Sequence, residues 1–233
     1  MSSYEVRTLT PAYLPQIMAL QEAYRQYYPR ATVIPGEIYL SPGFEVGANI
    51  FCAFDDQGCL RAYAPLLPNL TTEPGPPNVI WAEVKADPAL AGLQEIKDLL
   101  FERVVARARE IARSSTEKPT QLTFQYHPSE SASVEYVLSK GAAYTATVFR
   151  MMRDLSAEIP VVPRPDGIDV RYWRMETQME QQEYVNARNE AFPDLPVSLE
   201  DWQSFLQSGL WREASAVTAF DGPEIAGCVA AYC

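Results

Sequence analysis

The side chains that could do nucleophilic, acid–base or metal chemistry are few in this chain of 233 residues. His127 is the only histidine, in a Tyr-His-Pro loop after an apparent strand, so a metal site with two histidines is excluded. A Ser-His-Asp or Cys-His mechanism has this one candidate base, which we interpret as a loop histidine. Cys52 and Cys59 flank a hairpin turn and could face each other, but for a reducing compartment we expect small buried thiols. The other two cysteines are Cys228 and Cys233.

The charge and hydropathy of the chain limit the classes of partner that it can bind. The net charge is −11 and there is no run of Lys and Arg, so the protein repels phosphate backbones and anionic membrane surfaces, and we expect neither nucleic acid nor membrane partners. No stretch of 18 apolar residues occurs, and residues 1–10 lack the pattern of a signal peptide. We therefore expect a cytoplasmic protein.

Two short motifs recur late in the chain at nearly the same spacing. Residues 4–7 (Tyr-Glu-Val-Arg) recur as 168–171 (Ile-Asp-Val-Arg), an offset of 164 (168 − 4). Residues 53–56 (Ala-Phe-Asp-Asp) recur as 219–222 (Ala-Phe-Asp-Gly), an offset of 166 (219 − 53). Two similar offsets favour a duplicated domain. On this spacing, the second copy reaches only what corresponds to Leu67–Pro68 of the first. We expect a complete domain at 1–155, a proline-containing linker at 156–166 and a partial second copy at 167–233.

Hydrophobic periodicity and turn residues predict the same opening order of elements in both copies, a strand, one or two helices and a hairpin. The hairpin of the first copy turns at Asp55–Gly58 and that of the second at Asp221–Gly222. Only the first copy continues with a strand, helix, strand, helix and final strand. The expected elements of the first copy are strand 4–9, a helix after Thr10 and Pro11 to about 28, strands 50–54, 60–64 and 78–86, helix 93–113, strand 121–126, helix 129–139 and strand 143–154. Those of the second are strand 168–173, helix 177–192, helix 199–208 capped by Ser198, and hairpin 215–232.

This order, together with two local motifs, resembles the GNAT superfamily of acyl-coenzyme A N-acyltransferases. The motifs are the opening 6–12 (Val-Arg-Thr-Leu-Thr-Pro-Ala) before an amphipathic helix, and the closing 137–142 (Val-Leu-Ser-Lys-Gly-Ala) before 149–155. The resemblance implies an α/β fold, a mixed sheet flanked by helices, and transfer of an acetyl group from acetyl-CoA to a small amine. Two tandem copies resemble the mycothiol-synthase-like branch, in which one copy typically does the chemistry.

The resemblance also implies a cofactor site. Its pantetheine would hydrogen-bond along the backbone of Glu83, Val84 and Lys85. Its pyrophosphate would bind a loop of the form (Arg or Gln)-x-x-Gly-x-(Gly or Ala), whose backbone N–H groups form an anion nest at a helix N-terminus. Here the stretch 88–96 departs from that form and Glu95 adds negative charge. The expected contacts of this loop are Ala91, Gly92, Gln94 and Ile96, of which Ala91, Gln94 and Ile96 occupy the three motif positions without matching them.

Two catalytic roles follow from the resemblance. The attacking amine must lose a proton, and Glu83, in a strand beside the expected acyl site, is our candidate general base. It could equally face solvent or pair with Lys85. The family often carries a tyrosine that protonates the leaving thiolate four residues before the stop glycine. That position is Val137 here and Tyr136 is adjacent, so Tyr136 is either the acid or a packing residue.

Two functions remain open at this point, with an unrelated α/β domain as a third reading. One is a GNAT-like N-acetyltransferase. The other is a catalytically inert GNAT-shaped binding or scaffold half of a tandem protein, because the phosphate loop is degenerate. The last strand, 225–232, has an apolar edge that we expect to dock against the first copy or against a second chain as a homodimer. A monomer with rapid amide exchange throughout that strand would contradict this docking.

Overall fold

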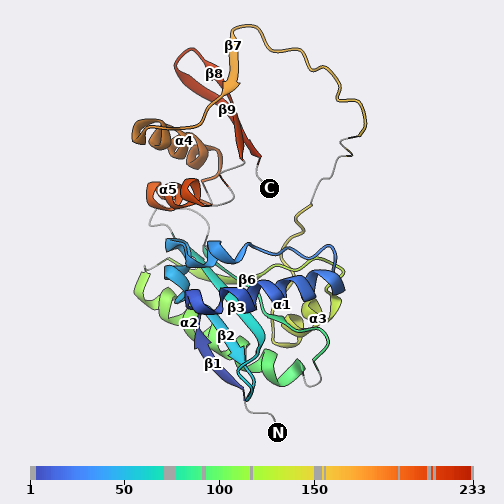
Figure 1. The fold of residues 1–233 in the computed structure, drawn as a ribbon. Helices are drawn as coiled ribbons and strands as arrows, with labels where there is room; N and C mark the ends of the chain where they lie inside the picture. Colours follow the sequence, from blue (N-terminus) through green and yellow to red (C-terminus); the bar gives the residue numbers. More distant parts are fainter. Residues whose placement is uncertain are drawn as a thin grey trace.

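The computed structural model describes residues 4–70, 77–90, 93–115, 118–149, 154, 156–193, 195–208, 211 and 214–231. They form two separate sheets (Figure 1). We call residues 4–149 the first unit and residues 168–231 the second unit. The segment between them, within 154–167, contains no helix or strand in its described part, and the linker at 156–166 stays a prediction.

The first unit is a mixed sheet in the order β1-β2-β3-β4-β6, with β5 also paired to β3. The neighbours from β1 to β4 are antiparallel, whereas β4 and β6 are parallel. The strands are β1 (Glu5–Thr8), β2 (Ile50–Phe54), β3 (Leu60–Asn69), β4 (Asn78–Ala82), β5 (Lys85–Ala86) and β6 (Thr120–Phe124). The helices are η1 (Pro11–Tyr13), α1 (Leu14–Tyr27), η2 (Gly36–Leu40), η3 (Pro42–Gly47), α2 (Leu93–Ser115) and α3 (Ser131–Ser139).

Helices cover both faces of this sheet, which explains why β2 is buried throughout its length. The α2 helix places a stripe of apolar residues, including Ile96, Leu100 and Val104, on one face. On the other face, α1, η2 and η3 pack Ile17 and aromatic side chains against β2 and β3. Burial on both faces accounts for the near-continuous apolar sequence of β2, where alternation would mark a strand with one wet face.

The predicted hairpin between β2 and β3 is confirmed. Asp55 accepts hydrogen bonds from the backbone N–H groups of Gln57 and Cys59 at 3.0 and 2.9 Å, and Gly58 adopts a φ of +75°. Arg61 donates to the other carboxylate oxygen of Asp55 at 2.7 Å. Cys52 is buried and Cys59 exposed, and both are free thiols.

The second unit contains β7 (Ile168–Tyr172), α4 (Gln178–Ala191), α5 (Leu199–Gln207), β8 (Ser215–Asp221) and β9 (Glu224–Ala231). Thr177 and Glu180 form a reciprocal capping box at the start of α4, and Ser198 caps α5 as predicted. A small core fills the space between the two helices and the sheet. Its buried residues are Trp173, Met175, Val185, Trp202, Ala216 and Phe220.

Strand pairing in the second unit repeats that of the first at the offsets seen in the sequence. Val6 pairs with Ala53 in the first unit, and Val170 pairs with Ala219 in the second. A register shift follows the alanine in both hairpins, between positions 53 and 54 and between positions 219 and 220. Because register is sensitive to a slip of one residue, the shared pairing shows that the two motifs occupy equivalent places in their sheets.

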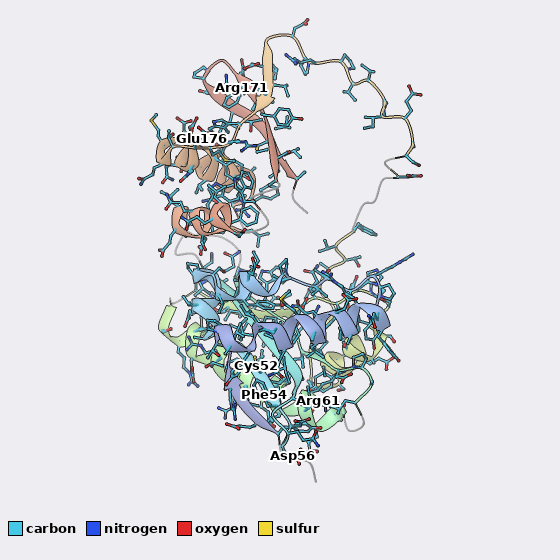
Figure 2. All side chains as sticks on the ribbon, in the orientation of Figure 1. Cys52, Phe54, Asp56, Arg61, Arg171 and Glu176 are labelled. Carbon is cyan, nitrogen blue, oxygen red and sulfur yellow. The ribbon has the colours of Figure 1, made fainter. Side chains whose placement is uncertain are left out.

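An arginine and an aromatic ring recur in this arrangement. The guanidinium of Arg7 lies 5.3 Å from the ring centre of Phe54, and that of Arg171 lies 4.2 Å from the ring centre of Phe220. Figure 2 labels Phe54 in the first unit and Arg171 in the second. These cation–π contacts join the first strand of each unit to the second.

The two units differ in what surrounds the third strand. In the first unit β3 pairs with β4 and β5 along its outer edge, whereas β9 has no partner there among the residues described for the second unit. No helix of the described chain covers the face of the second sheet that corresponds to the α2 face, and Tyr172 and Val229 remain 77% and 67% exposed. Docking of strand 225–232 on another chain stays a prediction, and residue 232 lies outside the described residues.

Two predicted strands need correction. The strand predicted at 78–86 is interrupted at Glu83 and Val84, because the parallel partner β6 leaves it there. The strand predicted at 143–154 is wrong in its described part, since 143–149 contains no strand and Tyr144, Val148 and Phe149 are mostly exposed. A β-prone stretch forms a strand only where a neighbouring edge pairs with it. Residues 150–153 lie outside the described residues.

Gly47 and Gly58 provide a matched stability test. Both have positive φ, at +91° and +75°, but a Cβ at Gly47 would lie 2.8 Å from the carbonyl oxygen of Leu9, whereas no described atom lies within 4 Å of one at Gly58. Gly58→Ala is expected to lower the free energy of unfolding by about 1–2 kcal/mol for backbone strain alone. Gly47→Ala should cost about 1–3 kcal/mol more, because the backbone must also shift. Urea denaturation of both variants measures the difference, and equal losses would contradict the close approach of η3 to β1.

Candidate active site

The sheet of the first unit opens at one point. The parallel pairing of β4 with β6 runs from Asn78 opposite Thr120 to Ala82 opposite Phe124 and then stops. Beyond it the chain stays on β3, where Glu83 donates its N–H to the Pro65 carbonyl at 3.3 Å. After residue 82, the edge of the chain that faces β6 therefore has no strand paired with it. A gap of this kind exposes backbone groups that need other hydrogen-bond partners.

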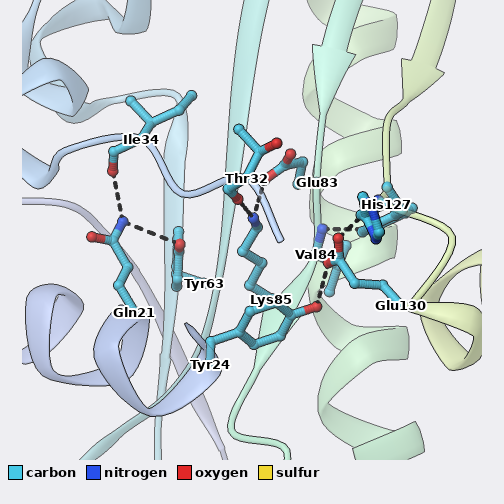
Figure 3. Close-up of polar contacts among 11 residues, drawn as sticks. Gln21, Tyr24, Thr32, Ile34, Tyr63, Glu83, Val84, Lys85, His127 and Glu130 are labelled. Atoms are coloured by element: carbon cyan, nitrogen blue, oxygen red, sulfur yellow. Dashed lines mark hydrogen bonds and ion pairs between the residues drawn. The ribbon is translucent and has the colours of Figure 1, made fainter. Parts of the chain in front are cut away.

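A buried ion pair lies beside the opening, as Figure 3 shows. The Lys85 ammonium is 2.9 Å from the Glu83 carboxylate, and the Lys85 side chain is only 1% exposed. The ammonium also donates to the Thr32 carbonyl and lies 5.3 Å from the ring centre of Tyr24 on α1. The sequence leaves two alternatives to catalysis for Glu83, which are facing solvent and pairing with Lys85. The structure shows the pair with Lys85.

Glu83 nevertheless keeps two properties of a general base. Its side chain is 17% exposed, whereas its partner is almost completely enclosed. Burial raises the pKa of Glu83 above its usual value, while the charge of Lys85 opposes that rise. A carboxylate with a raised pKa accepts a proton more readily near neutral pH than an ordinary glutamate does.

Tyr126 fills the position next to Glu83. The Val84 N–H donates to the Tyr126 hydroxyl at 2.9 Å, across the gap between the two strands. Burial raises the pKa of this tyrosine, so it stays a neutral phenol. The Val84 N–H, which the resemblance assigns to pantetheine, therefore already has a hydrogen-bond partner within the chain.

Glu130 extends the polar cluster to α1 and α3. Its carboxylate accepts hydrogen bonds from the Tyr24 hydroxyl at 2.7 Å and from the backbone N–H of His127 at 2.9 Å. Glu130 is only 1% exposed. The His127 ring lies 2.8 Å from the Ser129 hydroxyl, in a loop, as the sequence predicts. On the other side of the cluster, Gln21 of α1 donates to the Tyr63 hydroxyl at 3.2 Å.

The predicted cofactor loop is described only in part. Ala91 and Gly92 lie outside the described residues. The Gln94 side chain is exposed and donates to Asp98 at 3.1 Å. Ile96 is fully buried against the sheet, so its side chain cannot reach a ligand. In the described part of this loop, backbone N–H groups of the first turn of α2 remain for an anion.

Tyr136 lies in a different environment from Glu83. It is 6% exposed, and its hydroxyl donates to Asp98 of α2 at 2.9 Å. Burial, followed by the hydrogen bond to Asp98, raises the pKa of Tyr136. Its ring packs edge-on against Phe101 at 5.9 Å. These contacts favour the packing alternative, and the acid role stays a prediction.

The sequence indicated Glu83, Val84 and Lys85, which the structure brings together, but missed Tyr126 and Glu130. One available signal was that Tyr126 is the last residue of the strand expected at 121–126. Within the described ranges there is no group of three or more His, Cys, Asp and Glu side chains placed to hold a metal ion. The same part of the chain holds no helix that is long and apolar enough to span a membrane.

Solved structures identify the fold. A GCN5-related N-acetyltransferase from Sphaerobacter thermophilus superposes with a TM-score of 0.62 at 18% identity, covering 97% of this chain and 70% of that one. The chain has the fold of the GCN5-related N-acetyltransferases. The alignment is long enough to include both units, and it agrees with the predicted mixed α/β sheet flanked by helices. No protein-family model and no curated protein sequence matches the chain.

Two further acetyltransferases superpose over a smaller part of the chain. The aminoglycoside N-acetyltransferase AAC(6')-Iy in complex with CoA has a TM-score of 0.46 at 16% identity, covering 66% of this chain and 96% of that one. The glucosamine-6-phosphate N-acetyltransferase from Arabidopsis thaliana has a TM-score of 0.45 at 10% identity, covering 65% of this chain and 99% of that one.

The raised pKa of Glu83 predicts a pH dependence of stability. Between the usual glutamate pKa and the higher pKa in the folded state, the folded protein binds more protons than the unfolded chain. The stabilising contribution is therefore complete below the unfolded pKa and is lost as pH rises through the folded pKa. In urea denaturation from pH 4 to 8, the difference in unfolding free energy between wild type and Glu83→Gln should fall as pH rises. The exposed variant Glu22→Gln should show no such trend, and a flat difference for Glu83→Gln would contradict the shift.

Proposed function

We propose that the protein is an acetyl-CoA-dependent N-acetyltransferase that acts on a small amine, with Glu83 as general base. The observation that carries this proposal is the opening of the sheet beside a partly exposed carboxylate whose pKa is raised by burial. The fold shared with the GCN5-related N-acetyltransferases supports it.

The residues around the opening suit the steps of such a transfer. Acetyl-CoA supplies the activated acetyl group as a thioester. Glu83 accepts the proton that the acceptor ammonium loses, so that the amine nitrogen can form its bond to the acetyl carbon as the carbon–sulfur bond breaks. The Val84 N–H points into the gap and can donate to a carbonyl oxygen there, in place of the Tyr126 hydroxyl. The nitrogen loses two protons on going from ammonium to amide. Glu83 takes the first, and the second, lost once the carbon–nitrogen bond has formed, goes to the departing thiolate, which leaves as a thiol.

We also propose a tandem arrangement, with a first domain at 1–155, a linker at 156–166 and part of a second copy of the same fold at 167–233. The shared register and the repeated contact between arginine and aromatic ring support this division. In this proposal the chemistry belongs to the first domain, where the sheet opens at Glu83.

A specific observation favours the second candidate, a catalytically inert binding or scaffold unit. The Val84 N–H is already satisfied by Tyr126, and Ile96 of the phosphate loop is a core residue. If Tyr126 never leaves, acetyl-CoA has no backbone donor at this position. The two candidates therefore differ in whether acetyl-CoA binds the first domain.

Glu83→Gln tests the proposed catalysis. The variant keeps the shape of the side chain but cannot accept the proton, so kcat for the best amine found in a thiol-release assay should fall about 10²- to 10⁴-fold. Isothermal titration should show that acetyl-CoA still binds with an affinity within about threefold of wild type. Unchanged kcat would remove Glu83 as the base. No acetyl-CoA binding near millimolar ligand would favour the inert unit.

Tyr126→Phe tests whether the hydroxyl competes with acetyl-CoA. Without it the Val84 N–H lacks a partner until a ligand supplies one, so acetyl-CoA should bind about fivefold more tightly, as expected for about 1 kcal/mol of net hydrogen-bond energy. Tyr172→Phe, on β7 of the second unit and 77% exposed, is the control with the same chemical change. Weaker binding by Tyr126→Phe would mean that this hydroxyl contacts the ligand directly.

A further inference from the structure

A cavity of about 520 Å³ lies at the junction of the two units. The first unit contributes η2, η3 and the adjoining ends of β3 and β4, and the second contributes α5 and the segment before it. Both units supply apolar walls, among them Leu40, Phe44 and Trp81 on one side and Val197 and Phe205 on the other. The volume lies within the range of sites for small molecules, about 300–1,000 Å³.

The position of Trp81 relates the cavity to the proposed catalytic group. Trp81 lines the cavity and lies two residues before Glu83. Ile80, Ala82, Val84 and Ala86 all lie in the core against α2, so the intervening side chains of Trp81 and Glu83 face the other side of the sheet. A molecule in the cavity therefore lies on the face of the sheet that carries Glu83.

The charged side chains of the cavity favour a cation. Glu37 lines it from the first unit and Asp201 from the second. The one positive side chain among the lining residues, Arg188, donates to the Leu195 carbonyl at 2.6 Å. Two carboxylates against one guanidinium leave an excess of negative charge among the lining residues, which attracts an ammonium group.

Resting on the proposed function, we infer that this cavity binds the acceptor, and that the acceptor is a primary amine carried on an aromatic or other apolar body. The aromatic walls match the body and the carboxylates match the ammonium. The α5 helix of the second unit forms one wall, so the acceptor site is incomplete without the second unit. The repeated segment thereby acquires a role in choosing the acceptor.

Tyramine is a suitable probe because it combines a phenol ring with a primary amine. Isothermal titration of the full chain should show saturable binding. Ser204→Trp on α5 fills the cavity from the second unit and should weaken tyramine at least tenfold. Gln182→Trp introduces the same side chain at an exposed position of α4 outside the cavity, and should leave the affinity unchanged. If Ser204→Trp fails to fold, Asn69→Trp fills the cavity from the first unit instead.

The chemical class is tested with N-acetyltyramine, which keeps the ring but lacks the cation and should bind at least fivefold more weakly. The inference is overturned if wild type does not bind tyramine at millimolar concentration, if the filled variants bind it as wild type does, or if N-acetyltyramine binds equally well. Acetyl-CoA is titrated separately. If it fails to bind while tyramine binding still depends on the cavity, the proposed catalysis fails and the cavity remains an amine site.

Discussion

The buried ammonium of Lys85 constrains the arrangement of the whole first unit. Removing an ammonium from water costs several kcal/mol, so its environment must supply compensating charge and dipoles. Glu83 supplies the charge, the Thr32 carbonyl a dipole, and Tyr24 a ring face. These groups belong to the opening of the sheet, to the loop after α1 and to α1 itself. Satisfying one cation therefore holds α1 against the sheet at the point where β6 departs.

The same departure of β6 explains why a candidate base and an internal hydrogen-bond partner occur side by side. A parallel pair that separates leaves N–H groups on the unpaired edge, and a buried N–H without a partner is costly. Tyr126 satisfies the Val84 N–H in the free protein. A ligand carbonyl would replace one hydrogen bond by another of similar strength. The protein can thus keep the gap filled without a ligand and without a permanent energetic penalty.

Local signals in the sequence predicted what depends on local chemistry. The hairpin at Asp55–Gly58 was predictable because Asp and Gly stabilise the turn whatever surrounds it. Pairing with Lys85 was one of the alternatives that the sequence left open for Glu83. The partners of Val84 and of Glu130 join residues 42 and 106 positions apart, so no local pattern indicates them. The strand predicted at 143–154 is wrong over 143–149 for the same reason. A strand forms there only if the edge of another strand, distant in the sequence, pairs with it.

The unequal size of the two cores bears on how the cavity between them works. Helices cover both faces of the first sheet, whereas the second unit has one small core centred on Trp173 and Trp202. The contact between α5 and η3 joins the units, and the described linker residues add no helix or strand to it. Interfaces of limited extent within a chain usually permit relative motion. Part of the wall on the first unit, Trp81, belongs to β4, in the sheet whose opening holds Glu83. The wall on the second unit can move without disturbing the ion pair, which suits an acceptor site that must open to admit an amine.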